Sequence, residues 1–377
     1  MSQLQKRFSS LDVFRGMTIC LMIIVNTPGN GATTFSPLLH AQWNGFTPTD
    51  LVFPSFLFAV GNALSFVMKK WANLSNSEVN AKILKRTFII FLLGYLMYWF
   101  PFVWWDDTGN LAGIPFFKTR IFGVLQRIAL CYGISALIIH YLKPKVALII
   151  SILFLILYWI LLVVFGGNDY MGMQTNFGFV VDKWLIGENH MYHGEGVAFD
   201  PEGLLSTMPA IANVVGGFWV GKYLQEKGIS YVTLAKLSVA GILLLLGAYF
   251  WNMTFPVNKK LWTSSYVLHT VGLDCIIISV IIYIIDFKKK TKWTYFFEVF
   301  GRNPIVIYLF SELGATLLYF FRTDAGNPES NFFRVIYNKV FEPIGGNWGS
   351  LAFAVSFMML CWLVGYVMDK KKWYVRV

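Results

Sequence analysis

The sequence predicts an all-α integral membrane protein with about ten transmembrane helices and both termini in the cytoplasm. Three observations lead to this prediction: the composition, a series of long apolar stretches, and the distribution of Lys and Arg. Hydrophobic residues make up 56% of the 377 residues and charged residues only 14%, whereas soluble domains usually carry about 25% charged residues. This composition argues against a soluble enzyme, a disordered chain and a nucleic-acid-binding protein.

Ten apolar stretches account for the predicted helices. A helix that crosses the hydrocarbon core of a bilayer needs about 20 mainly apolar residues, and Val146–Phe165 reaches this length without a charge. The chain shows no internal repeat and no flexible linker, which predicts a single domain over residues 1–377. The predicted spans are Asp12–Gly29, Leu51–Met68, Ile83–Pro101, Ile121–Tyr141, Val146–Phe165, Leu204–Tyr223, Leu234–Met253, Trp262–Ile285, Phe296–Phe321 and Leu351–Met368.

The positions of Lys and Arg predict the orientation of these spans. If the N-terminus lies in the cytoplasm, most of the 31 Lys and Arg residues fall in inside segments, as the positive-inside rule expects. Membrane topology therefore explains the net charge of +11. The first span opens with Asp12 and Arg15 and no small-residue cleavage pattern follows it, so we expect it to be retained and not to be a signal peptide.

Three long loops are then expected on the outer face: Asn30–Asp50, Gly166–Gly203 and Arg322–Ser350. Long loops with polar and aromatic residues are where binding groups tend to lie. A functional site is therefore expected at the outer face. Neither a disulfide nor a metal site is expected, because all four Cys residues lie in apolar stretches without paired spacing.

The first of these loops carries the strongest chemical signal. His40 titrates near neutral pH, so its imidazole can accept a proton or be transiently acylated. Asp50 can orient the ring and stabilise its charged form, and Asn26 and Asn44 can donate hydrogen bonds to the oxyanion that forms when a carbonyl is attacked. The alternative is that His40 and Trp43 are interfacial residues of an aromatic belt.

Six blocks of sequence, in order along most of the chain, resemble the heparan-α-glucosaminide N-acetyltransferase family. Several ordered blocks are far more specific than any single motif. We expect the protein to lack the additional N-terminal luminal domain and first span of the lysosomal members. A long glycan, a small amino sugar and a cell-envelope fragment therefore all stay open as acceptors. The blocks are Arg7–Gly16 followed by Asn26, His40–Pro54, Gly123–Ile128, Phe199–Gly203, Lys260–Tyr266 and Gly301–Pro304.

The resemblance implies a multi-pass transferase of the cell membrane. Such an enzyme moves acetyl from cytoplasmic acetyl-CoA to the amine of a glucosamine-type sugar at the outer face. The resemblance implies that His40 is the essential histidine and Asn26 its nearby asparagine, and with Asp50 they form the predicted catalytic set. His40 is expected to be either an acetylated nucleophile or a general base. The resemblance also implies a homodimer, and it implies no metal.

Polar residues inside the predicted spans are candidates for binding the donor, acetyl-CoA, because ionisable groups at membrane depth are costly and are usually functional or paired. Arg15 is expected to hold a phosphate of the donor, or to pair with Asp12 three residues earlier. Pro304 is expected to kink the ninth span. The other candidates to line the donor site, with hydrogen bonding between helices as their alternative role, are Gln126, Arg127, Arg302 and Asn303.

The acceptor is expected to bind at the outer loops, and the second of these is acidic, which would attract a cationic amino sugar. The expected acceptor-binding residues are Trp43, Asn44, Asp200 and Glu202.

In the same second loop, His190 and His193 do not have the spacing of a metal site. His269 and Asp274 lie in the eighth span, where either could belong to a proton path, and the favoured interpretation of His269 is a buried histidine with satisfied hydrogen bonds.

Two other functions fit the same composition and span pattern. A sugar or amino-sugar transporter would also have many helices, buried charges and a proline-kinked span, and would be expected to show inverted repeats, which the sequence lacks. A membrane O-acyltransferase acting on a sugar hydroxyl would need the same base as an N-acetyltransferase. An acceptor assay separates these possibilities.

Overall fold

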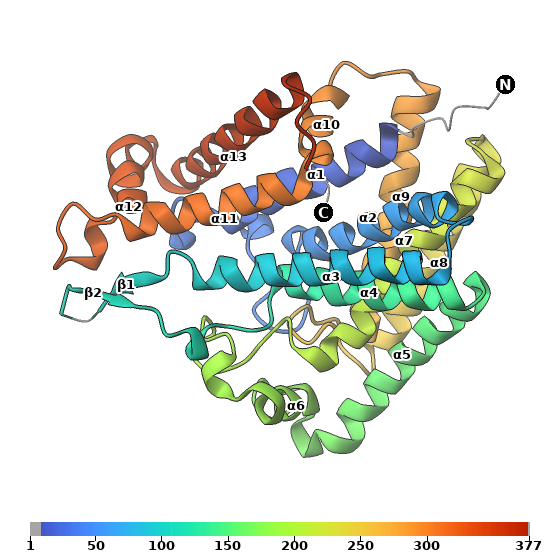
Figure 1. Cartoon of the computed structure of the whole chain (residues 1–377), viewed down its shortest axis with the longest axis horizontal. Coiled ribbons are helices and arrows are strands. Elements are labelled where there is room, and N and C mark those ends of the chain that lie inside the picture. The colour runs from blue at the N-terminus through green and yellow to red at the C-terminus, as the bar shows by residue number, and fades with distance from the viewer. Residues whose placement is uncertain (1–8, 107, 376–377) are drawn as a thin grey trace.

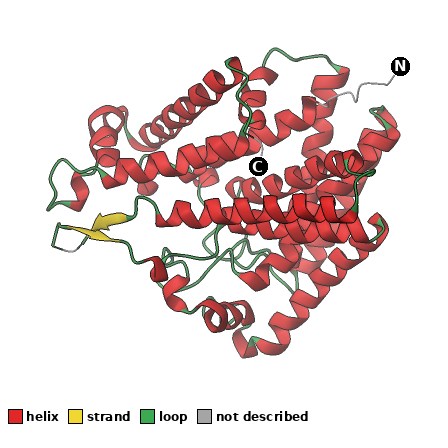
Figure 2. Ribbon diagram, viewed as in Figure 1, coloured by secondary structure: helices red, strands yellow, loops and turns green. Residues whose placement is uncertain are grey.

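The computed structural model describes residues 9–106 and 108–375, and Arg7 and Phe8, which open the first of the six blocks, lie outside them. Figure 2 shows helices throughout and one short antiparallel hairpin, which confirms the all-α prediction. The helices are α1 (Ser9–Asn26), α2 (Pro48–Lys70), α3 (Asn76–Trp99), α4 (Val124–Tyr141), α5 (Pro144–Phe165), α6 (Phe177–Ile186), α7 (Leu204–Lys227), α8 (Tyr231–Asn252), α9 (Ser264–Ile282), α10 (Thr294–Arg302), α11 (Pro304–Phe320), α12 (Phe332–Ile336) and α13 (Gly346–Lys370), and the strands are β1 (Val103–Trp105) and β2 (Leu111–Gly113).

The number of helices able to cross a membrane is smaller than predicted. Within the described residues, eight helices are long and apolar enough, and the bent pair α10 and α11 makes a ninth if it counts as one span. The predicted third span, Ile83–Pro101, corresponds to α3, which is not among these candidates. The physical reason is that Lys82, Lys85 and Arg86 interrupt the first half of α3 and leave a short apolar remainder.

Local sequence signals start the helices. α3 begins with a capping box, in which the Ser75 hydroxyl accepts a hydrogen bond from the backbone N–H of Glu78 and the Glu78 carboxylate accepts one from the backbone N–H of Ser75. α2 begins with Pro48 at its first position, where a missing N–H costs nothing. In the same turn Asp50 accepts a hydrogen bond from the backbone N–H of Thr47 at 2.9 Å. This turn carries Asp50 into the candidate site.

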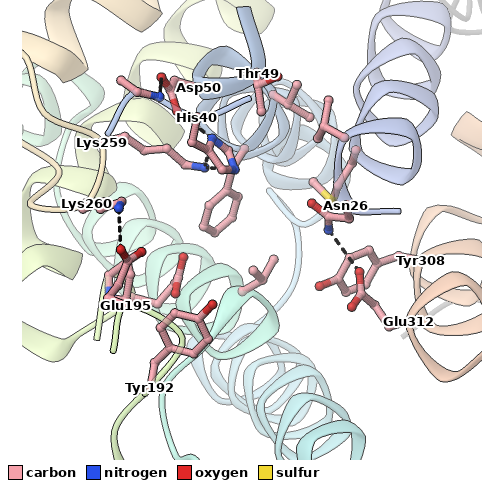
Figure 3. Close-up of a pocket in the computed structure, with 18 of the residues that line it drawn as sticks. Asn26, His40, Thr49, Asp50, Tyr192, Glu195, Lys259, Lys260, Tyr308 and Glu312 are labelled. Atoms are coloured by element: carbon pink, nitrogen blue, oxygen red, sulfur yellow. Dashed lines mark hydrogen bonds and ion pairs between the residues drawn. The ribbon is translucent and has the colours of Figure 1, made fainter. Parts of the chain in front are cut away.

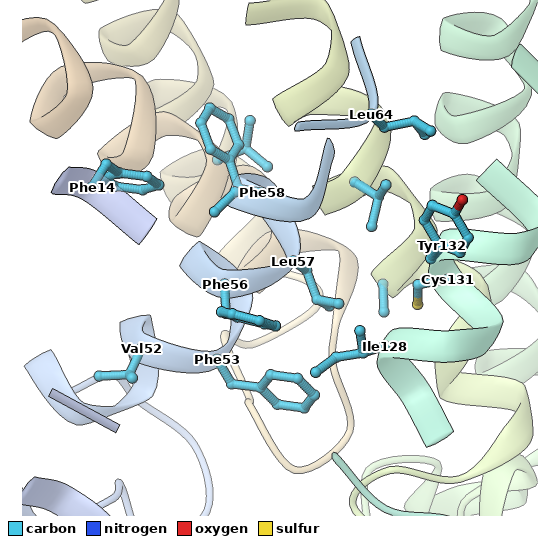
Figure 4. Packing of buried hydrophobic residues seen from close by; sticks show 14 of the residues in the cluster. Phe14, Val52, Phe53, Phe56, Leu57, Phe58, Leu64, Ile128, Cys131 and Tyr132 are labelled. Carbon is cyan, nitrogen blue, oxygen red and sulfur yellow. The ribbon is translucent and has the colours of Figure 1, made fainter. Parts of the chain in front are cut away.

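Helix α2 lies at the centre of the hydrophobic core, where it packs against α1, α4, α7 and α9 (Figure 4). Leu57 and Phe58 are fully buried in this core. The contact with α7 is close because each helix presents a glycine to the backbone of the other. A Cβ atom on Gly61 would overlap the carbonyl oxygen of Val214, and one on Gly217 would overlap that of Phe58.

The predicted ninth span is broken at the expected proline. α10 and α11 meet at an angle of 83° around Pro304, which confirms the predicted kink and shows it to be a sharp bend. Asn303, between the two helices, donates from its amide to the carbonyl oxygen of Trp373 at 2.9 Å and accepts from the backbone N–H of Val375 at 3.0 Å. The segment after α13 therefore covers the bend. In Figure 1, α11 and α13 run side by side from this region.

Candidate active site

A cavity of about 340 Å³ lies where the C-terminal end of α1 meets the N-terminal end of α2 (Figure 3). Residues of α1, α2, α3, α4 and α11 line it, together with four loops that the sequence predicts on one side of the membrane. The predicted site residues that line this cavity are Asn26, His40, Asp50 and Glu202. The fold thus brings the predicted catalytic set together from a helix end, a loop and a second helix.

His40 and Asp50 form one contact at the wall of this cavity. Nδ1 of His40 lies 2.7 Å from Oδ1 of Asp50, whose side chain is fully buried. Because an ionised carboxylate only accepts hydrogen bonds, Nδ1 carries a proton and donates it to Asp50, and Nε2 keeps its lone pair. Burial lowers the pKa of His40, as does the charge of Lys259, while Asp50 and Glu202 oppose this shift. The lowered pKa favours the uncharged ring at neutral pH, the form in which an imidazole can act as a base or a nucleophile.

The first turn of α2 holds Asp50 in position. Its Oδ2 accepts hydrogen bonds from the backbone N–H of Thr47 at 2.9 Å and of Ala41 at 3.2 Å. The hydroxyl of Tyr266 donates to the backbone carbonyl of Asp50 at 2.6 Å. The carboxylate that caps α2 thus also fixes the loop next to His40 and sets the direction of the imidazole.

Lys259 contacts the same imidazole from the loop between α8 and α9. Its Nζ lies 3.1 Å from both Nδ1 and Nε2 of His40. Burial lowers the pKa of Lys259, although the charges of Asp50 and Glu202 oppose this. An amino group in this position can donate a hydrogen bond to negative charge that develops beside Nε2.

Arg120 organises the acidic side of the cavity. It forms a bidentate pair with Asp200, through Nη2 at 2.6 Å and Nε at 3.1 Å, and Nη2 also lies 2.6 Å from Oε2 of Glu202. The rings of Tyr98 and Tyr192 lie 5.0 and 4.6 Å from its guanidinium carbon. Burial would raise the pKa of Glu202, but the attraction of Arg120 and other nearby cations outweighs it and lowers that pKa. Asp200 anchors Arg120 from outside the cavity lining.

Two further carboxylates line the cavity. Glu195 accepts a hydrogen bond from Nζ of Lys260 at 2.6 Å. Glu312 of α11 accepts one from Nδ2 of Asn26 at 3.1 Å. The predicted oxyanion donor, Asn26, therefore gives one of its two amide hydrogens to a carboxylate and has a second one to donate.

Trp43 and Asn44, predicted to bind the acceptor, lie outside the cavity lining. The indole nitrogen of Trp43 donates to the carbonyl oxygen of Met171 at 3.0 Å. The side-chain oxygen of Asn44 accepts from Nδ2 of Asn258 at 3.2 Å. Both side chains attach the first loop to other loops of the chain.

Gln126 and Arg127, predicted to bind the donor, are fully buried among helices. Nη2 of Arg127 donates to the carbonyl oxygen of Gly203 at 3.0 Å and to the hydroxyl of Ser206. The guanidinium also lies over the ring of Trp262, 4.8 Å from its centroid. Arg127 thus joins α4 to the start of α7, next to the block that carries Glu202.

Arg15, Arg302 and Asn303, also predicted to bind the donor, lie near the bend between α10 and α11. Arg15 pairs with Asp12 at 2.8 Å, and Arg302 pairs with Glu298 at 2.7 Å. Along α1, Arg15 is about 16 Å from the end of the helix that lines the cavity. These three residues form a second polar cluster at the far end of α1.

Arg120, Lys259 and Glu312 line the cavity although the sequence prediction did not select them. A signal for each was present. Arg120 and Lys259 lie in segments predicted outside, where Lys and Arg are scarce. Glu312 is the one charged residue in the otherwise apolar α11, and such residues are commonly functional.

Other polar candidates have local partners. The rings of His269 and Phe46 are 4.5 Å apart, Asp274 accepts from the Ser55 hydroxyl at 2.5 Å, and Nδ1 of His190 lies 2.7 Å from a backbone carbonyl oxygen. Over residues 9–106 and 108–375, no group of three or more His, Cys, Asp or Glu side chains is arranged to hold a metal ion.

Comparisons with known proteins agree with the six blocks. Residues 7–182 match the family model described as heparan-alpha-glucosaminide N-acetyltransferase, catalytic. The chain is 29% identical over 368 residues to heparan-alpha-glucosaminide N-acetyltransferase of Homo sapiens, covering 83% of this chain and 54% of that protein. It is 29% identical over 364 residues to the protein of the same name from Mus musculus, covering 81% and 53%.

The chain thus spans about half the length of the curated relatives it matches. The matched catalytic region contains Asn26, His40 and Asp50, and the similarity continues beyond it over most of the chain. These matches show that the chain is similar to the heparan-alpha-glucosaminide N-acetyltransferase family over most of its length.

Proposed function

We propose that this protein is a membrane N-acetyltransferase that transfers acetyl from acetyl-CoA to the amine of a glucosamine-type sugar, with His40 as the reacting side chain. The observation that carries the proposal is the contact between the imidazole of His40 and the buried carboxylate of Asp50 at the wall of a cavity. Both residues lie in the region that matches the catalytic family model. The names of the relatives supply the reaction class.

In one route, His40 is a nucleophile. Nε2 attacks the thioester carbonyl carbon, the C–S bond breaks, and the CoA thiolate leaves and takes up a proton. The sugar amine then attacks the acetyl group on Nε2, the bond between Nε2 and the acetyl carbon breaks, and the neutral imidazole is released. The nitrogen loses one proton as the amide forms, which balances the proton that the CoA thiolate takes up. Asp50 stabilises the positive charge on the acetylated ring through its contact with Nδ1–H.

In the other route, His40 is a general base. Nε2 takes a proton from the sugar nitrogen as that nitrogen attacks the thioester directly, and Asp50 stabilises the imidazolium that results. Both routes place negative charge on the carbonyl oxygen. Lys259, with Nζ 3.1 Å from Nε2, is the donor suited to stabilise it.

The donor is proposed to arrive from the cytoplasm, so that acetyl crosses the membrane while CoA does not. The phosphates of CoA need cations, and Arg15 and Arg302 are the predicted ones. Both already pair with carboxylates, Asp12 and Glu298. Binding of a phosphate there requires these pairs to open or to share their arginine.

The experiment that tests the proposal measures CoA thiol released by purified, detergent-solubilised protein. Acetyl-CoA is supplied with and without glucosamine, and wild type is compared with His40→Ala. His140→Ala is the matched control. His140 lies in the last turn of α4, at the end of the helix that is remote from the cavity, and it contacts Asn76 there. We expect glucosamine-dependent release in wild type and control and its loss in His40→Ala. Full activity in His40→Ala would refute both routes.

A second measurement separates the two routes. Protein incubated with [¹⁴C]acetyl-CoA and no acceptor should retain label on His40 if the ring is acetylated, and the label should pass to glucosamine when it is added. Absence of bound label in an active preparation supports direct transfer. Glucose in place of glucosamine tests the O-acyltransferase alternative in the same assay.

A further inference from the structure

Helix α11 brings one charged side chain into the cavity. Glu312 is the single Asp, Glu, Lys or Arg residue in the 17 residues Pro304–Phe320. A carboxylate in a helix that is apolar enough to lie in a membrane is costly, so such residues commonly mark a binding or transport function. Tyr308, four residues earlier and therefore on the same face, lines the cavity as well.

The contacts of Glu312 differ from those of the other carboxylates in this cavity. Asp50 contacts His40, Glu195 pairs with Lys260, and Glu202 pairs with Arg120. Glu312 accepts a hydrogen bond from the neutral amide of Asn26. Among the residues that the structure describes, no Lys, Arg or His forms an ion pair with it. It therefore has capacity for a cation that none of the described residues supplies.

The position of Glu312 separates it from the reacting imidazole. Figure 3 shows Asn26, Tyr308 and Glu312 together on one side of the cavity. On the opposite side lie the two lysines and His40. A ligand between these sides would meet a carboxylate at one end and a neutral imidazole with an ammonium group beside it at the other.

We propose that Glu312 is the subsite that receives the ammonium group of the acceptor sugar. This inference rests on the proposed function and names the residue that selects an amine over a hydroxyl. A primary ammonium donates charge-assisted hydrogen bonds to a carboxylate, which are stronger than those between neutral groups. Asn26 holds the carboxylate in position through the other oxygen, Oε1.

If the ammonium group binds at Glu312, the opposite wall of the cavity, with Lys259 and His40, is left for the acetyl donor. An ammonium group is repelled by Lys259 and Lys260, so it enters the cavity toward α11. The thioester carbonyl, which becomes negatively charged during transfer, suits the side of Lys259 and His40. The two walls thereby distinguish the acceptor nitrogen from the donor oxygen when the two substrates bind. The ammonium gives one proton to the carboxylate of Glu312, and the neutral amine that results then reaches the acetyl group beside Nε2 of His40, where the amide bond forms.

The test is the variant Glu312→Gln, which keeps the size of the side chain and an oxygen that can accept from Asn26. We expect KM for glucosamine to rise at least about tenfold, the loss that corresponds to one charge-assisted hydrogen bond. KM for acetyl-CoA should stay unchanged. Glu329→Gln is the matched control, because Glu329 is exposed and pairs with Arg334 on a surface segment.

A neutral acceptor separates charge recognition from damage to the fold. A sugar hydrazide has a nucleophilic nitrogen that carries no charge at pH 7, so its transfer rate should be the same in wild type and in Glu312→Gln. An equal loss with both acceptors, or an unchanged KM for glucosamine, overturns the proposal.

Equilibrium binding covers the case in which the proposed function itself fails. If wild type releases no CoA, binding of glucosamine and of glucose is measured by calorimetry without donor. Tighter binding of glucosamine that disappears in Glu312→Gln supports the ammonium subsite independently of transfer. Equal affinity of wild type for the two sugars contradicts it.

Discussion

Nδ1 of His40 lies 2.7 Å from Oδ1 of Asp50, a carboxylate fixed in the first turn of α2. One side chain therefore serves two purposes, because Oδ2 caps the helix through Thr47 while Oδ1 sets the tautomer of the imidazole. The imidazole of His40 and the start of α2 therefore share a single rigid anchor.

Asp50→Asn tests the tautomer. The amide can still accept from Thr47, but an NH₂ group facing Nδ1 favours the tautomer with the proton on Nε2, which removes the reactive lone pair. We expect kcat for CoA release to fall about 100-fold or more, the usual contribution of a positioned base. Glu78→Gln is the control, since Glu78 caps α3 in the same way at a capping box with Ser75. An unchanged kcat in Asp50→Asn would exclude this role.

Lys259→Gln tests the electrostatic setting of His40. Burial and the charge of Lys259 both lower the pKa of His40. Removal of the charge therefore raises that pKa, so protonation inactivates the ring at a higher pH and the acidic limb of kcat/KM moves toward neutral pH. The measurement is the pH profile of kcat/KM. Lys260→Gln should leave the acidic limb in place, because Lys260 pairs with Glu195. If the acidic limb of kcat/KM does not move in Lys259→Gln, the charge of Lys259 does not set the protonation of His40.

The sequence predicted the parts of the site that lie close together in the chain. His40 and Asp50 are separated by ten residues and a helix start, so their contact follows from a loop that returns to its own helix. Asn26 was predicted from the six blocks, and the structure brings it to the same cavity. The helices themselves were predictable because apolar stretches of fixed length leave few alternatives.

Contacts between distant segments were not predictable in the same way. Lys259 reaches His40 across 219 residues of sequence, and Arg120 reaches Asp200 across 80. The sequence around each of these residues does not indicate which loops contact one another in the folded protein. Arg127 is a second example. The sequence predicted that this buried arginine lines the donor site or bonds between helices, but it did not indicate that its partner is the carbonyl oxygen of Gly203 at the start of α7.

Arg120→Met tests the ion-pair cluster. Arg120 is buried and pairs with two carboxylates, Asp200 and Glu202. Loss of one partner of a buried pair leaves uncompensated charge and typically costs about 3–5 kcal/mol. We expect a clear drop in the thermal unfolding temperature of the protein in detergent. Arg334→Met, which removes an exposed pair, should leave that temperature almost unchanged. Equal effects of the two variants would show that the cluster contributes no stability.

Gly61→Ala tests the close packing of α2 on α7. In a helix, alanine is favoured over glycine by about 1 kcal/mol, so helix propensity alone predicts a more stable protein. The added Cβ would instead overlap the carbonyl oxygen of Val214, a backbone atom that cannot move without shifting α7. Overpacking of this kind usually costs about 1–3 kcal/mol, and here no flexible side chain absorbs it. We therefore expect a lower unfolding temperature and less monodisperse protein by size-exclusion chromatography. Gly31→Ala is the control, because a Cβ there meets nothing within 4 Å. A Gly61→Ala protein as stable as wild type would mean that the two helices do not approach as closely as the structure places them.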